Sequence, residues 1–220
     1  MFEQGRQSNY VFCVTEKEAI VIIGRPREFD REAALDAAMR LFWRKGFATT
    51  SIKDLCDAMG IASPSLYAAF GCKETLYREA VARYLCTRGP PLWNKLTQAA
   101  TARAGVRSFL LAAAEIFPES EATPAGCMAV LGALCDEWPV AIAEDVRNSR
   151  LESLRRFRSR LEVAVIEGEL PASTDIDQLS RFFIGIFQGM AVQARDGATP
   201  VDLKGIVEVA MAAWPTDASD

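Results

Sequence analysis

The sequence contains no histidine, and this absence excludes a large part of enzyme chemistry. Without imidazole the chain can form neither a Ser-His-Asp nor a Cys-His nucleophile system, nor a metal site that needs a histidine ligand. The six cysteines show neither a C-x-x-C pair nor the dense spacing of a secreted disulfide scaffold. We therefore expect reduced thiols, no metal site, no cofactor and no enzymatic activity.

Long apolar runs are also missing. No stretch approaches the roughly 18 to 20 apolar residues that a membrane span requires. The short apolar run 19–23 follows Glu16, Lys17 and Glu18 rather than the basic segment that opens a signal peptide. Half of the 220 residues are nevertheless hydrophobic, which is enough for a sizeable core. We expect a folded cytoplasmic protein that does not enter a membrane.

The charge is distributed unevenly along the chain. The net charge is −4, but residues 24–88 contain 11 Lys/Arg and 8 Asp/Glu, a local charge of +3. Residues 89–220 contain 12 Lys/Arg and 18 Asp/Glu, a local charge of −6. If the protein binds a polyanion, the basic front part is therefore the part expected to meet it.

Apolar periodicity and helix-end signals predict an all-α fold. Strand signals are few, and proline or glycine separates the periodic segments. We expect residues 1–23 to be an N-terminal extension outside the fold, with disorder left open, 24–75 to form one domain and 76–216 a second. Beyond the first domain the expected helices are 73–87, ended by Gly89-Pro90-Pro91, and then 92–100, 103–117, 126–136, 140–168, 176–195 and 200–213.

Residues 30–70 contain the signals of three short helices. Asp30 suits the N-cap of the first, and Gly46 ends it. Thr50 or Ser51 caps the second, and Asp54 completes a capping-box pattern with Ser51. After a turn at Gly60, we expect Ser63 to cap the third helix with Pro64 at its first position. Two short helices joined by a glycine turn form a helix-turn-helix, a motif that places its second helix in the major groove of DNA.

Short segments between residues 24 and 76 follow one another in a fixed order and spacing: Gly24-Arg25-Pro26-Arg27, Ala37-Ala38, Leu41-Phe42, Gly46-Phe47, Thr49-Thr50-Ser51-Ile52, Ala58-Met59-Gly60-Ile61, Ser65-Leu66-Tyr67-Ala68-Ala69-Phe70-Gly71, Lys73-Glu74 and Leu76. Together these segments resemble the DNA-binding domain of the tetracycline-repressor family. The resemblance covers roughly residues 24–80, and beyond them only the helical layout is similar. Cys72 departs from the family, which more often has Asp, Ser or Asn there. The resemblance implies an N-terminal helix-turn-helix domain followed by a helical ligand-binding and dimerisation domain.

The resemblance also implies which residues meet double-stranded DNA. Tyr67 and Lys73 match phosphate contacts, although Tyr67 can instead be a surface aromatic. Thr50 and Ser51 match hydroxyl or backbone contacts to DNA, or they only cap a helix. Arg25 and Arg27 form a short basic arm or a solvated pair of charges. The full set of expected DNA contacts is Arg25, Arg27, Thr50, Ser51, Ala62, Ser63, Pro64, Ser65, Tyr67 and Lys73, of which 62–65 match the positions that read base edges.

For the second domain the resemblance implies a homodimer and an effector pocket. The expected dimer residues lie on helix 176–195: Phe183, Gly185, Ile186, Gly189 and Met190. Two glycines four residues apart would let a partner helix approach closely, or they are simply tolerated in a buried helix. The expected pocket residues are Trp93, Phe109, Phe117, Met128, Trp138 and Phe182, although aromatics at this spacing also suit a core.

These features together predict a ligand-responsive DNA-binding regulator. The resemblance favours a repressor that a small-molecule effector, of unknown identity, releases from a palindromic operator. The alternative is a helical carrier or thiol-dependent enzyme that has the same fold without DNA binding. Intact Ser65-Leu66-Tyr67 and Lys73 elements favour the regulator.

Overall fold

The computed structural model describes residues 29–121, 123–131 and 139–215, and all regular elements within these ranges are helices. The predicted all-α fold is therefore confirmed. Three expected site residues, Arg25, Arg27 and Trp138, lie outside the described residues, as does the expected extension 1–23. The helices are α1 (Arg31–Lys45), α2 (Ile52–Met59), α3 (Ser63–Phe70), α4 (Lys73–Thr97), α5 (Ala102–Ile116), α6 (Met128–Leu131), α7 (Val140–Ile166), α8 (Ile176–Arg195) and α9 (Pro200–Ala212).

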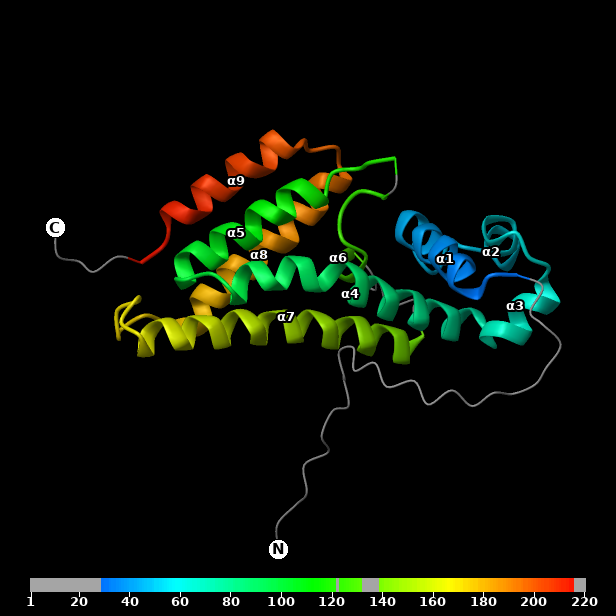
Figure 1. Cartoon of the computed structure of the whole chain (residues 1–220), viewed down its shortest axis with the longest axis horizontal. Coiled ribbons are helices and arrows are strands. Elements are labelled where there is room, and N and C mark those ends of the chain that lie inside the picture. The colour runs from blue at the N-terminus through cyan, green and yellow to red at the C-terminus, as the bar shows by residue number, and fades with distance from the viewer. Residues whose placement is uncertain (1–28, 122, 132–138, 216–220) are drawn as a thin grey trace, which may run out of the picture.

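Helices α1, α2 and α3 form a small head at one end of an elongated molecule (Figure 1). Helix α4 begins in the head and continues into a larger body, where α7 lies alongside it and α5, α8 and α9 pack together. The head is joined to α4 by aromatic contacts, since the Phe42 and Tyr77 rings meet edge to face with centroids 5.0 Å apart. Buried apolar residues form one cluster that continues from the head into the body. Helix α4 is thus the mechanical link between the two parts.

Helix α4 is longer than predicted, because it continues through Gly89, Pro90 and Pro91 to Thr97. The two prolines have no N–H to donate to the carbonyls one turn earlier, which costs about 3 kcal/mol or more in a helix interior. Burial of Leu92 and Leu96 offsets part of this cost, since each such side chain contributes about 1.5 to 3 kcal/mol. The expected separate helix 92–100 is therefore the last part of α4.

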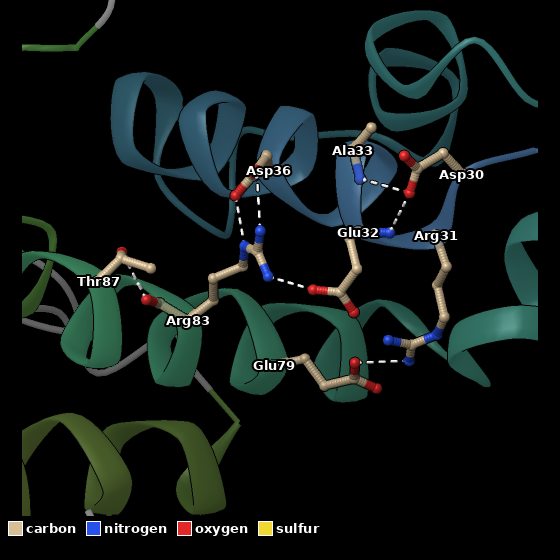
Figure 2. Close-up of polar contacts among 8 residues, drawn as sticks. All are labelled: Asp30, Arg31, Glu32, Ala33, Asp36, Glu79, Arg83 and Thr87. Atoms are coloured by element: carbon tan, nitrogen blue, oxygen red, sulfur yellow. Dashed lines mark hydrogen bonds and ion pairs between the residues drawn. The ribbon is translucent and has the colours of Figure 1, made fainter. Parts of the chain in front are cut away.

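Other helix ends follow their local signals. The Asp30 side chain accepts hydrogen bonds from the N–H groups of Glu32 and Ala33, at 2.9 and 3.1 Å, as the N-cap of α1 (Figure 2). Helix α8 has the predicted bounds, with Asp175 as its N-cap. None of the helices in the described ranges combines the length and the hydropathy needed to cross a bilayer.

Candidate nucleic-acid interface

Helices α2 and α3 form a helix-turn-helix whose crossing is fixed by buried side chains. Leu55 of α2 and Leu66 of α3 are completely buried, and Phe70 is almost so. Gly60 ends α2 with φ of 65°, in the left-handed region that glycine adopts without steric cost, and its N–H bonds to the Cys56 carbonyl. The predicted motif, two short helices joined by a turn at Gly60, is confirmed.

The N-terminus of α2 is held by the predicted capping box. The Ser51 hydroxyl accepts a bond from the Asp54 N–H, and an Asp54 carboxylate oxygen accepts one from the Ser51 N–H, both at 3.0 Å. The Ser51 N–H and hydroxyl both donate to the Asp54 carboxylate, and these two bonds, together with the Lys45 ammonium 3.2 Å away, lower the pKa of Asp54 to about 2. Ser51 is therefore the cap and remains exposed at the surface.

Thr50 does not occupy the expected surface position. Its side chain is completely buried, and its hydroxyl donates a hydrogen bond of 2.6 Å to the Gly46 carbonyl. This bond satisfies the carbonyl in the turn between α1 and α2, so the hydroxyl stabilises the loop. The expectation that the Thr50 hydroxyl contacts DNA is wrong, because a buried and already bonded group cannot reach a phosphate.

Helix α3 begins one residue earlier than expected. Ala62 is the N-cap and makes no side-chain cap bond, so Ser63 is the first helical residue and Pro64 the second. The Ser63 hydroxyl instead lies 3.4 Å from the Cys56 sulfur on α2. Ala62, Ser63 and Pro64 are exposed, and Ser65 is partly exposed. The structure therefore brings all four expected base-reading residues to the outer side of the first turn of α3.

Tyr67 and Lys73 flank the end of α3. Tyr67 is 48% exposed, although most large aromatic side chains in the head are buried. Lys73 is the first residue of α4, and its ammonium lies 4.3 Å above the centre of the Phe47 ring. Partial burial lowers the pKa of Lys73. Its N-cap, Cys72, makes no side-chain cap bond, in keeping with the departure from the family noted in the sequence.

An ion-pair network attaches α1 to α4 (Figure 2). The Arg83 guanidinium of α4 donates to both carboxylate oxygens of Asp36, one of them at 3.0 Å, and also to Glu32. The bonds that Arg83 donates to Asp36 raise the pKa of Arg83 and lower the pKa of Asp36. Arg31 of α1 pairs with Glu79 of α4 at 2.6 Å. These ion pairs therefore couple the position of α1 to that of α4.

A second connection runs from the end of α8 to the end of α1. The Arg195 guanidinium donates to the carbonyls of Trp43, at 3.1 Å, and Arg44. It also reaches the carbonyl of Ala125, at 3.4 Å, in the loop before α6. The last carbonyls of a helix have no intrahelical partner and favour a cation. Arg195 thus joins the body directly to the head.

The expected dimer residues divide into two groups. Phe183 and Met190 are completely buried within their own chain, where the Phe183 ring packs against Trp214, so neither can touch a partner. The expectation that Phe183 and Met190 are dimer residues is therefore wrong. Gly185 is exposed, whereas Gly189 and Ile186 are partly exposed. A Cβ atom on either glycine would meet no atom of the chain within 4 Å, so the chain's own packing does not require glycine there.

None of the expected effector-pocket residues that the structure describes belongs to the lining of the cavity that lies between α4 and α7. Phe109 and Phe117 are buried and pack against the Phe187 ring, with centroid distances of 4.9 and 5.1 Å, while Trp93 lies 4.8 Å from Phe109. Met128 is buried as well. These side chains fill the space between the helices. Phe182 is 40% exposed on the outside of α8, so its expected pocket role is wrong.

A cavity of about 490 Å³ lies instead between the first half of α4 and α7, partly open to solvent. Apolar side chains form much of its wall, namely those of Val81, Ala82, Leu85, Ile142 and Val146. The ion pairs Arg78–Asp145, at 2.6 Å, and Arg155–Glu152, at 2.7 Å, lie along its lining. We call this cavity the α4–α7 groove.

Sequence reasoning missed Arg31, Arg83, Arg195 and the groove. The partners of these arginines lie 38 or more residues away along the chain, beyond the reach of any helical or capping pattern. The local signal was the number of arginines in α1 and α4, which indicated only that cationic side chains form contacts in these helices.

Comparison with known proteins agrees with this geometry. Residues 34–80 match the family of bacterial regulatory proteins described as the tetR family. The repressor ComR of Escherichia coli K12, named as HTH-type, is 34% identical over 197 residues, which cover 87% of this chain and 92% of ComR. The repressor BdcR of the same organism is 46% identical over 79 residues, or 36% of this chain and 40% of BdcR.

The fold is also shared with solved structures. A cysteine mutant of CifR, a TetR family transcriptional regulator complexed with a 26 bp double-stranded operator, superposes with a TM-score of 0.83 at 41% identity. The match covers 87% of this chain and all of that one. A regulator from Chloroflexus aurantiacus has a TM-score of 0.73 at 24% identity, covering 83% of this chain and 92% of that one, and supports the fold alone.

Proposed function

The chain belongs to the tetR family of bacterial regulatory proteins and is a helix-turn-helix transcriptional regulator, and from this premise we propose how it works. We propose that it represses transcription as a homodimer on a palindromic operator, and that a small molecule bound in the α4–α7 groove releases it. The proposal has three parts, which concern the DNA contacts, the dimer and the effector.

The exposed first turn of α3 supports the DNA contacts. Ala62, Ser63, Pro64 and Ser65 carry small side chains, so α3 can enter a major groove about 12 Å wide without obstruction. Tyr67 is exposed in the second half of α3, Lys73 follows α3 at the start of α4, and Ser51 is exposed at the N-terminus of α2. All three suit phosphate contacts. This combination of a slim exposed helix with flanking phosphate donors is the observation that carries the proposed function.

Exposed apolar stripes on α8 and α9 support the dimer. On α8 the exposed or partly exposed positions Phe182, Gly185, Gly189 and Val192 repeat with helical spacing, and on α9 Val201 and Val209 are each 76% exposed. An apolar surface that water would otherwise contact suits a protein partner. A second copy related by a twofold axis would form a four-helix bundle over these stripes and present two α3 helices on one side.

The volume and lining of the α4–α7 groove support the proposed effector site. Its volume lies in the range of 300 to 1,000 Å³ that is usual for small-molecule sites, and apolar walls with a few charged groups are typical of them. The groove lies against the part of α4 that carries Glu79 and Arg83, which are bonded to α1. A ligand that separates α4 from α7 would therefore displace the head, while Arg195 resists the displacement from the side of α8.

We expect the purified protein to shift DNA from upstream of its own gene with a dissociation constant of about 10⁻⁸ M or lower, and unrelated DNA at least ~1,000-fold more weakly. Ala68→Glu adds a carboxylate to the exposed side of α3. Because this carboxylate repels phosphates, the variant should bind neither the upstream DNA nor the unrelated DNA. Ala141→Glu, at an exposed position of α7, is the matched control and should bind normally. A carrier or enzyme on the same fold would shift neither DNA, and that result would contradict the proposed function.

We expect Gly189→Leu to give a folded monomer. Leucine would enter open space in the isolated chain and raises helix propensity, so the subunit itself should not be destabilised. In the dimer the same side chain would hold the two α8 helices apart. Sedimentation velocity at micromolar concentration should show the change, with Ala141→Leu as the control that stays dimeric. A monomeric unmodified protein, or an unchanged Gly189→Leu dimer, would rule out this interface.

A further inference from the structure

Helix α3 has few contacts that fix its orientation. It contains only eight residues, and its N-cap Ala62 supplies no side-chain bond. Leu66 and Phe70 anchor it in the core, and the Ser63–Cys56 contact joins its first turn to α2. Leu66 and Phe70 fix how α3 crosses α2, and a further contact, from α1, is made at the C-terminal end of α3.

Arg31 of α1 supplies that contact at the other end of α3. Its guanidinium carbon lies 4.3 Å above the centre of the Phe70 ring, and one of its nitrogens donates to the Ala69 carbonyl at 3.3 Å. The same nitrogen pairs with Glu79 of α4 at 2.6 Å (Figure 2). One side chain thus connects three helices at the C-terminus of α3.

We propose that Arg31 is a positioning residue that sets the angle of α3, and through it operator selectivity, without touching DNA. This role rests on the proposed function, in which α3 faces the bases. The last carbonyls of a helix lack intrahelical donors, and a cation there also interacts favourably with the helix dipole. The planar guanidinium can stack on Phe70 and bond to both partners at once, which the ammonium of lysine cannot reproduce.

Selectivity should depend on Arg31 more than general DNA affinity does. Reading base edges requires directional contacts from Ser63 and Ser65, which a small rotation of α3 would misplace. Lys73 lies on α4 and would stay in position for its phosphate. Because Glu79 neutralises Arg31, the arginine adds little to the attraction of the head for a polyanion.

The chain offers a matched control for this role. Arg83 also ties α1 to α4, through Asp36 and Glu32, and within the described part of the chain these bonds reach α1 and not α3. Arg83→Lys therefore loosens the same pair of helices without releasing the recognition helix. It separates a loss of head stability from a loss of α3 orientation.

The experiment compares Arg31→Lys, Glu79→Gln and Arg83→Lys with the unmodified protein. Fluorescence anisotropy would measure the affinity for the shifted upstream DNA and for a scrambled duplex at several salt concentrations, and circular dichroism would measure Tm. We expect Arg31→Lys and Glu79→Gln to lower the ratio of the two affinities at least tenfold. The affinity for scrambled DNA and its salt slope should change less than twofold. Arg83→Lys should lower Tm and leave the ratio unchanged.

Two results would overturn the role of Arg31. If Glu79→Gln strengthens binding to both duplexes, Arg31 is instead a phosphate-binding residue whose contact with DNA is weakened by its ion pair with Glu79. If Arg31→Lys weakens binding to both duplexes by the same factor and lowers Tm as Arg83→Lys does, Arg31 only stabilises the head. A lack of selectivity in the unmodified protein would contradict the proposed function itself, and the positioning role with it.

Discussion

Replacing Lys73 by alanine should weaken binding to operator and to unrelated DNA alike, by about 100-fold. A hydrogen bond to a charged group contributes about 1.5 to 3 kcal/mol, and a dimer loses two, so the total is about 3 kcal/mol or more. Partial burial against Phe47 has already removed some water from the ammonium, which reduces the desolvation cost on binding. Tyr67→Phe should act in the same direction with a smaller effect.

The salt dependence of binding identifies this role. Each lost phosphate contact lowers the slope of log affinity against log salt by about 0.9. Lys73→Ala removes two such contacts from the dimer, so the slope should fall by about 1.8. Lys95→Ala removes the same charge from the last turn of the same helix, far from the head, and should leave both affinity and slope unchanged (Figure 1). Ser65→Gln should instead alter which operator is preferred. If Lys73→Ala changed base preference and left the slope untouched, the assignment of roles would be wrong.

A ligand in the α4–α7 groove should weaken operator binding about 5- to 150-fold, a coupling free energy of about 1 to 3 kcal/mol. Anilinonaphthalene sulfonate is a suitable probe, because it combines an apolar ring system with an anion for Arg78 or Arg155 at the groove. By thermodynamic linkage, operator DNA must weaken dye binding by the same factor that the dye weakens operator binding. Dye fluorescence and operator anisotropy measure the two sides independently.

The groove is tested by filling it. Ala82 is exposed and lines the groove, so Ala82→Trp should lower dye affinity more than tenfold without disturbing the core. The variant should still bind operator, and the dye should no longer affect that binding. Ala141→Trp, at an exposed position of α7 outside the lining, should behave like the unmodified protein. Equal dye affinity with and without operator would show that the groove is not coupled to the head.

Helix-end chemistry explains which features could be predicted from the sequence. A cap and its partner lie within a few residues, so Asp30, the Ser51–Asp54 box and the turn at Gly60 were all predictable. Even here the start of α3 was misplaced by one residue, since Ala62 is the N-cap and the Ser63 hydroxyl contacts the Cys56 sulfur of α2. A local pattern therefore locates a helix end to within about one or two residues.

The sequence by itself determined the all-helical fold, the helix-turn-helix and the bounds of α8, because these depend on periodicity and on bonds between near neighbours. Tertiary structure decided which face of α8 turns inward. Phe182 and Phe183 are adjacent and equally apolar, and packing against Trp214 buries only the second. Tertiary packing also lets α4 continue through Pro90 and Pro91. It brings Arg31 and Arg195 to carbonyls and carboxylates that are distant in the sequence. Those outcomes depend on segments that meet only after the chain has folded, so no local pattern encodes them.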